Sequence, residues 1–415
     1  MMTQAYYTGL SGLVSTQKAI DITSDNIANS STVGFRSVNT EFTTLFEAAV
    51  NTPSNQQEVG LGSRVNASST IMKNGAISLT EKSTDLAIDG DGWFGVVDGD
   101  KKYFTRAGDF VFDSNNDLIT RDGKYVLGTM ADNIKDHTLT KEISETQIKD
   151  IGSQETLRFP KDLNYPPVPT QNAQFFGNLG VEDEPRTLGA TVIDQQNNRN
   201  NLKLLFTKSQ QQNPPGTQWD VVATTQSSDG SIIYDTKTAQ VSFNENGALI
   251  SSTLSTIDNN GTEVTIDLGK DFSGVVATNS AATNGSSQSD GTIGGELVGY
   301  EINRHADVIA TFSNGKQSSV GKIGLFHFSN DQGLDRISGT LYKESSNSGN
   351  AFFYKDSNGN NILGSDIMNY SLENSNVEME TALTELIVYQ RSFDANSKII
   401  STADQMIQKA LSMDG

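Results

Sequence analysis

Both ends of the chain carry apolar residues at alternating spacings of four and three, the pattern of a helix that packs along another helix. The N-terminal seam contains Leu10, Leu13, Ile20 and Ile27, and the C-terminal seam contains Leu383, Leu386, Phe393, Ile400 and Ile407. The pattern predicts helices over residues 1–30 and 376–415. If helical from Ser375 to Ser412, the second segment would extend roughly 57 Å at about 1.5 Å per residue, which is too long for a small core. We therefore expect the two helices to pair in a coiled-coil-like inner domain.

Polar residues interrupt both seams, namely Gln17 and Ser24 in the first and Gln390, Ser397 and Asp404 in the second. A polar residue at a seam position can specify register or oligomer geometry. The same residues could also face solvent on a broad amphipathic helix, and an intramolecular coiled coil would explain the seams without a polymer. Before the second helix, residues 374–376 read as Asn-Ser-Asn, which predicts an N-cap region.

The middle of the chain is typical of β-structure, with short apolar runs separated by Asp-Gly and Asn-Gly turn signals. Residues 146–292 form a second β-rich stretch, entered through a proline-rich segment and left through a segment rich in Ser, Thr, Asn and Gly. The predicted fold is mostly β with long α-helical termini and two β-rich domains, the outer one inserted in the inner one. The predicted domains are a helical domain (1–30 and 376–415), an extended linker region (31–75 and 365–375), an inner β domain (76–145 and 293–364) and an outer variable β domain (146–292).

Charge and composition exclude several classes of function. The 415 residues have a formal net charge of -20, which disfavours nucleic-acid binding. Without any cysteine the chain can form no disulfide or thiolate site. No apolar run approaches the ~18–20 residues of a membrane span, so membrane insertion is not expected. The N-terminus also lacks the basic region and apolar core of a cleavable signal peptide.

Two acidic segments resemble calcium loops and fail on closer reading. The sixth position of an EF-hand calcium loop must be glycine. It is Leu118 in the segment that begins at Asp113 and Asn361 in the segment that begins at Asp356. We expect both to be turns built on Asx hydrogen bonds. Trp93 and Trp219 are predicted to be core residues. The sequence therefore predicts no catalytic, cofactor-binding or metal-binding residue and no cofactor. We expect the protein not to be an enzyme.

Three groups of segments together resemble the axial proteins of the bacterial flagellum, which include rod and hook proteins, and the hook members most closely. The resemblance covers about residues 1–130 and 295–415, and the middle matches only generally. Trp93 departs from the family, in which phenylalanine is more common at this position. The segments that carry the resemblance are Gly9–Leu13 with Asp25–Arg36, then Ile88–Phe94 with Tyr103–Phe110 and Gly123–Gly128, and finally Phe312–Gly315, Phe328–Asn330, Leu372–Glu378 and Gln390–Asn396.

The resemblance implies a structural subunit that self-assembles into a curved, flexible tube, transmits motor torque to the filament and encloses the export channel. The nine seam residues would then make the self-assembly contacts. The implied partners are further copies of the chain, the distal rod, hook cap and hook-filament junction proteins, and the flagellar type III export apparatus. The implied location is the extracellular hook, reached without a cleaved signal peptide. A distal rod or hook-like junction protein is the first alternative, and a secreted β-rich hydrolase or binding module is a remote one.

Overall fold

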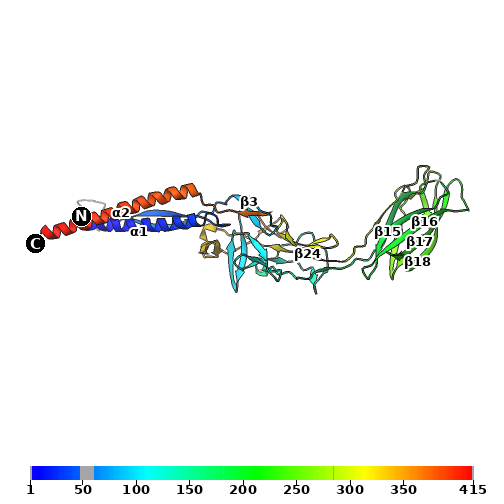
Figure 1. The fold of residues 1–415 in the computed structure, drawn as a ribbon, viewed down its shortest axis with the longest axis horizontal. Helices are drawn as coiled ribbons and strands as arrows, with labels where there is room; N and C mark the ends of the chain where they lie inside the picture. The colour runs from blue at the N-terminus through cyan, green and yellow to red at the C-terminus, as the bar shows by residue number, and fades with distance from the viewer. Residues whose placement is uncertain (1, 47–59, 181, 284, 414–415) are drawn as a thin grey trace.

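The computed structural model describes residues 2–46, 60–180, 182–283 and 285–413. The molecule is elongated, with three regions along its long axis (Figure 1). A helical arm made of both chain ends occupies one end. An inner β body (residues 71–168 and 292–378) follows, and an outer β unit (residues 170–290) lies at the other end. Both chain ends therefore lie far from the outer β unit.

The helical arm contains α1 (Met2–Ala28) and α2 (Met379–Met413), which lie side by side (Figure 1). Both predicted terminal helices are confirmed as helices. Helix α1 ends where the backbone and side-chain amides of Asn29 donate to the Asp25 carbonyl oxygen, at 3.1 and 2.9 Å. Gly34 then adopts a left-handed φ of 67°, which lets the chain turn into the β body.

The predicted N-cap of α2 is wrong. The carbonyl oxygen of Glu378 accepts from the Ala382 amide at 2.9 Å, so the helix begins after residues 374–376. The Asn376 side chain instead accepts from the Ser37 amide at 2.7 Å and donates to the Ile71 carbonyl oxygen at 2.8 Å. Asn376 therefore ties the C-terminal segment to the N-terminal one, a tertiary use that competes with local capping.

Much of the predicted linker is a paired hairpin. Strands β1 (Val38–Phe46) and β2 (Gly60–Thr70) are antiparallel and pack along α1. Asn26 of α1 anchors the hairpin, because its side chain both donates to and accepts from the backbone of Val38, at 2.8 and 2.9 Å. Residues 47–59 of the predicted linker lie outside the described residues. Residues 365–375 also pair, since β32 (Asp366–Asn369) and β33 (Ser371–Glu373) join β4 (Leu86–Asp89) and β3 (Ile77–Leu79).

The inner β body is organised around one large sheet, in which blocks of strands from the two halves of the chain pair with each other. For example, β26 from the C-terminal half lies between β25 and β9. Buried aromatic and aliphatic side chains of this body form two adjoining cores, one of them around Trp93. The sheet strands are β5 (Trp93–Asp98), β6 (Lys101–Thr105), β7 (Phe110–Phe112), β8 (Leu118–Thr120), β9 (Tyr125–Met130), β10 (Ile134–Lys135), β11 (Thr138–Leu139), β12 (Glu155–Thr156), β13 (Asn164–Tyr165), β24 (Gly295–Ile302), β25 (Asp307–Phe312), β26 (Gln317–Ile323), β27 (Leu325–Phe326), β28 (Asp335–Ser338) and β29 (Leu341–Lys343). The remaining elements are β30 (Tyr354–Lys355), β31 (Asn361–Ile362) and the 3-10 turns Ile151–Ser153 and Asp331–Gly333.

The outer β unit packs two five-stranded sheets around one core that contains Trp219. Along β16, buried and exposed side chains alternate, as expected for a strand with one face in the core. One sheet has β15 (Arg186–Ile193), β16 (Arg199–Lys208), β17 (Thr217–Ser227), β18 (Ile233–Phe243) and β19 (Leu249–Ser252). The other has β14 (Asn172–Asn178), β20 (Thr256–Asn259), β21 (Thr262–Asp267), β22 (Val275–Val276) and β23 (Ser286–Ser289).

The packing does not change at residue 146, where the boundary of the outer domain was predicted. Leu157, Phe159 and Leu163 are buried in the core of the inner β body. Strands β12 and β13 pair with β9 and β24 of the inner sheet. The change comes near Thr170, just beyond the point where Val168 pairs with Thr292. The apolar residues between positions 146 and 168 are too few to form a core of their own. They therefore pack into the core of the inner β body, which is the nearer one.

Candidate assembly surface

The most buried stripe of α1 consists of small or short side chains: Gly9, Thr16, Ala19, Thr23 and Asn26 are buried, and Gly12 in the same stripe is half-buried. The two glycines face α2 closely. A Cβ atom on Gly12 would lie 2.9 Å from the Asn396 side chain, and one on Gly9 would lie 3.1 Å from Ile400. Such distances show that the helices approach more closely than larger side chains would allow. Beside this stripe, the hydroxyl oxygens of Ser15 and Ser63 lie 3.0 Å apart and link α1 to β2.

The predicted seam of α1 lies one residue further along the chain than this stripe, which is about 100° around the helix. Leu13, Ile20 and Ile27 are consequently only partly buried, and Leu10 is 38% exposed. On α2, the predicted residues Leu386, Phe393, Ile400 and Ile407 are partly buried, whereas Leu383 is 45% exposed. None of the nine predicted residues is fully buried. The arm therefore leaves apolar surface available on both helices.

Other apolar residues of the arm are more exposed than the predicted seam, and the seam pattern missed them. On α1, Tyr7 and Val14 are exposed beside Leu10. On α2, consecutive apolar residues at 386–388 and 399–400 cannot all face one partner helix, so some must point elsewhere. These runs were the sequence signal for a second apolar face. Its exposed members outside the predicted seam are Ile387, Val388, Ile399 and Met406, and Leu383 of the seam is exposed beside them.

Two apolar grooves lie on this surface. One of about 400 Å³ runs between α1 and β2, where Tyr7, Leu10 and Val14 meet Val65. The other, of about 500 Å³, is lined by Ala5 of α1 and mainly by α2 residues, among them Ile399 and Met406. Exposed apolar patches rimmed by polar residues mark interaction sites in many proteins. The arm therefore has the chemistry of an interface that another helix can cover.

A buried ion cluster joins the arm to the inner β body. The Arg36 guanidinium lies 2.6 Å from the Glu373 carboxylate, and Arg106 lies 3.4 Å from its other oxygen. All three side chains are at most 3% exposed. Burial lowers the pKa of Arg106 to about 10, and the charge of Glu373 opposes that shift. Arg106 also stacks over the Trp93 ring at 5.5 Å. The root of the arm is therefore fixed by charges that water does not reach.

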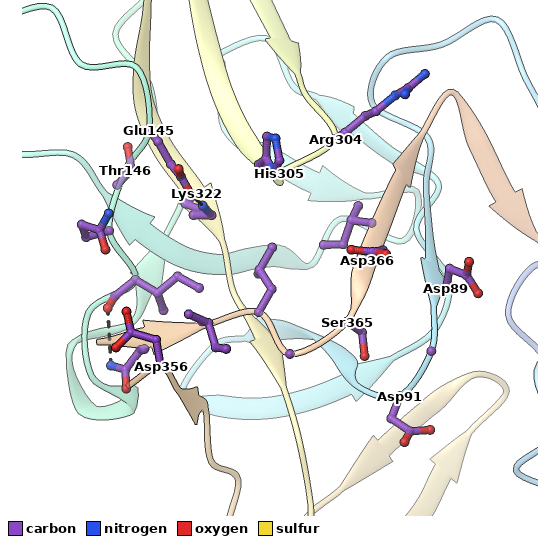
Figure 2. Close-up of a pocket in the computed structure, with 18 residues that line it drawn as sticks. Asp89, Asp91, Glu145, Thr146, Arg304, His305, Lys322, Asp356, Ser365 and Asp366 are labelled. Carbon is purple, nitrogen blue, oxygen red and sulfur yellow. Dashed lines mark hydrogen bonds and ion pairs between the residues drawn. The ribbon is translucent and has the colours of Figure 1, made fainter. Parts of the chain in front are cut away.

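The inner β body contains a polar cleft of about 800 Å³ (Figure 2). Arg304 and His305 come from the turn between β24 and β25, and Asp89 and Asp366 are register partners on β4 and β32. Among the described residues, no three His, Cys, Asp or Glu side chains are placed to hold a metal ion. The two acidic turns are also closed on themselves. Asp113 accepts from the Asn115 amide at 2.7 Å and Asp356 from the Asn358 amide at 2.8 Å, which confirms the predicted Asx turns.

The aromatic residues that could have formed a binding face are core residues. Trp93 is 1% exposed and Trp219 is 0% exposed, as predicted. His327 is also buried, and its Nε2 lies 2.6 Å from the carbonyl oxygen of Leu363. In the part of the chain that the structure describes, neither helix is both long and apolar enough to cross a membrane.

Three family models match the regions that carry the arm and the inner β body. A model described as flagella basal body rod protein matches residues 7–36, which include α1 and Arg36. The flagellar hook protein FlgE/F/G D1 domain matches residues 87–153. The flagellar basal body rod FlgEFG protein C-terminal matches residues 368–413, which include Glu373 and α2.

Full-length proteins are similar to this chain as well. The flagellar hook protein FlgE of Borreliella burgdorferi is 28% identical over 461 residues, covering 98% of this chain and 99% of that protein. The flagellar hook protein FlgE of Escherichia coli is 28% identical over 423 residues, covering 99% and 100%. The crystal structure of Helicobacter pylori flagellar hook protein FlgE2 has a similar fold, with a TM-score of 0.51 at 17% identity over 72% of this chain and 100% of that chain. Over nearly its whole length the chain is therefore similar to flagellar hook proteins, and its two terminal segments are similar to the flagellar rod and hook family models.

Proposed function

We propose that this chain is a structural subunit of a bacterial flagellar hook, and that its copies polymerise through the helical arm into a curved, flexible tube. The observation that carries this proposal is the apolar surface that remains on α1 and α2 after they have paired with each other. Ile387 and Val388 are 51% and 54% exposed, although they lie in the middle of an apolar run. In a polymer of identical subunits, each arm can cover the exposed face of its neighbour.

The three regions take different mechanical roles in this proposal. The paired helices form the inner wall of the tube and line the export channel. The inner β body carries load between neighbouring subunits, because the buried Arg36–Glu373 contact joins it firmly to the arm. The outer β unit slides past its neighbours as the tube bends. Its surface supports this role, since outward positions such as those of β23 are serine and glutamine. Boundaries near 170 and 291 for an inserted outer domain belong to the same proposal.

Export and partners complete the proposal. The subunit reaches the outside of the cell through the flagellar type III export apparatus without a cleaved signal peptide. It joins the distal rod at one end of the tube and hook-filament junction proteins at the other, and assembles beneath a hook cap. The same arm would serve a distal rod or junction protein. Similarity to hook proteins over 98–99% of this chain, outer β unit included, favours the hook.

Electron microscopy of the purified chain under polymerising conditions tests the proposal. The wild-type chain should form curved tubes. Ile387→Ser should prevent assembly, because it removes an apolar contact that each subunit would make, and should leave the melting of the β regions unchanged. Gln390→Ser is the matched control, since it places the same residue at an exposed polar position of the same helix. A wild-type chain that remains monomeric at high concentration, or an Ile387→Ser chain that assembles normally, would contradict the proposed interface.

A further inference from the structure

A buried lysine in the inner β body has no role in the proposed assembly. Lys322 lies on β26, and its register partner across the strand pair is Asp307 on β25. Lys322 is 4% exposed and Asp307 is 0% exposed. Their neighbours Val308 and Ile323 belong to the hydrophobic core. An amine and a carboxyl group are thus held next to each other in a largely apolar environment.

The contacts of the Asp307 carboxyl group are asymmetric. Its Oδ1 accepts from the Thr146 amide at 2.9 Å and from the Ser319 hydroxyl at 3.1 Å. Its Oδ2 accepts no hydrogen bond from the described residues and lies 3.6 Å from the Lys322 Nζ. One oxygen therefore meets two donors, as in an oxyanion hole, while the other faces the amine.

Glu145 completes the cluster from the side of the polar cleft. Its Oε1 lies 2.6 Å from the Lys322 Nζ, and its side chain is 53% exposed. Figure 2 shows Glu145 and Lys322 together on one wall of the cleft. The hydrogen bond from Lys322 lowers the pKa of Glu145, whereas burial raises the pKa of Asp307. Relative to their ordinary values, the shifts favour the carboxylate form of Glu145 and the acid form of Asp307, which are the forms that acid–base catalysis uses here.

We propose that Lys322 and Asp307 condense into an intramolecular isopeptide bond, with Glu145 as the general base. Glu145 takes a proton from the Lys322 ammonium group, and the neutral Nζ attacks the Cγ of protonated Asp307. The Thr146 amide and the Ser319 hydroxyl stabilise the negative charge that develops on Oδ1. Glu145 then passes the proton to Oδ2. The Cγ–Oδ2 bond breaks, a second proton leaves the nitrogen for solvent as Oδ1 returns to a carbonyl, and one water molecule departs through the cleft.

The fixed positions of Lys322 and Asp307 favour a condensation that free lysine and aspartate do not undergo in water. Strand pairing holds the two groups in contact, so the reaction is intramolecular and avoids the entropy cost of bringing them together. The cleft gives the released water an exit on the side of Glu145. With no cysteine in the chain, this bond would be a covalent cross-link of the β25–β26 hairpin of a kind that disulfides cannot supply.

The mass of the intact, denatured full-length chain tests this inference. The wild-type chain should weigh one water molecule less than its sequence predicts. Proteolysis should release a branched peptide that joins Asp307 to Lys322. Lys322→Arg and Asp307→Ala should both have the full mass. Asp307→Asn should lose one ammonia molecule in place of water, because the amide offers a different leaving group at the same carbon.

Glu145→Gln tests whether Glu145 acts as the general base. Because this side chain is half-exposed, the substitution removes the base without disturbing the core. The variant should still fold, with the same β-sheet signal in circular dichroism, and keep the full mass. A wild-type chain that retains the full mass after prolonged incubation in the folded state would overturn the inference. A loss of water located outside Asp307 and Lys322 would overturn it as well, and a Glu145→Gln chain that cross-links as fast as wild type would remove Glu145 from the mechanism. The measurement uses unassembled protein, so its outcome is independent of the proposed tube.

Discussion

Arg36 and Glu373 meet at 2.6 Å with both side chains 1% exposed, and this contact joins the segment that follows α1 to the segment that precedes α2. Glu373 also accepts from the Gly75 amide at 2.8 Å, and its carbonyl oxygen accepts from the Gly34 amide at the same distance. The two ends of the chain are therefore fastened to each other and to the β body at one point. Force on the helical arm can therefore pass to the inner β body through this contact.

Replacing Glu373 should destabilise the inner β body strongly. Glu373→Gln keeps the shape of the side chain and leaves Arg36 and Arg106 buried without a counter-ion, which typically costs about 3–5 kcal/mol. Asp132→Asn is the control, because it breaks a surface pair in which Asp132 is 85% exposed and should cost ~0–1 kcal/mol. Urea unfolding of both variants measures the difference. Equal losses in the two variants would show that the buried cluster adds nothing to stability.

Gly12→Val should separate the two helices of the arm. A Cβ at this position already lies 2.9 Å from Asn396, and valine adds two further methyl groups. Intrinsic propensity predicts a slight gain in helix, by a few tenths of a kcal/mol, so a loss must come from packing. Far-UV circular dichroism and assembly yield measure the effect. Ser24→Val, at an exposed position of the same helix, is the control and should change neither. A Gly12→Val chain with unaltered helicity and assembly would refute the close approach.

The stability of the inner β body should fall in mild acid because of His327. Burial lowers the pKa of His327 below its ordinary value, against the weaker opposing effects of the Leu363 carbonyl oxygen, Asp331 and Asp91. Below about pH 6.5 the unfolded chain therefore binds this proton more readily than the folded chain. Stability is fully present above that pH and is lost as pH falls toward the folded pKa.

His327→Gln removes this titration and keeps an amide that can donate to Leu363. The unfolding free energy of the wild type should therefore fall relative to the variant from about pH 7 to about pH 5. Denaturant unfolding at several pH values measures the unfolding free energy of both proteins as a function of pH. Carboxylates titrate in both proteins, so their contribution cancels in the difference. Parallel curves over this range would mean that His327 does not contribute.

Two deletions distinguish the proposed boundary of the outer β unit, near residue 170, from the boundary predicted at residue 146. Val168 and Thr292 exchange backbone hydrogen bonds at 2.8 and 2.9 Å, so the two chain segments that enter and leave the outer β unit are adjacent. Replacing residues 171–290 with a short Gly/Ser linker should leave a folded inner β body. Replacing residues 146–292 should not, because it also removes Leu157, Phe159 and Leu163 from the inner core. Thermal unfolding of the two products measures this, and equal stability would place the boundary back at 146.

Local features of this protein could be predicted from its sequence because they depend on neighbouring residues. The seams predicted two terminal helices, and the short apolar runs predicted a β-rich middle, which strands such as β16 and β21 confirm. The Asx turns at Asp113 and Asp356 were predictable for the same reason, since each closes on amides within a few residues. The positions of Trp93 and Trp219 in cores followed from their size and apolar surroundings.

The tertiary structure alone decided which surfaces of these elements meet. A seam pattern marks apolar stripes on a helix, but the buried stripe of α1 is chosen by close approach, and Gly9 and Gly12 permit an approach that Leu10 and Leu13 would block. The boundary of the outer β unit depends on which core the residues around Leu157 can reach. Arg36, Arg106 and Glu373 lie far apart in the sequence. Their charges could not be recognised as partners until folding removed the water around them and left only each other to satisfy them.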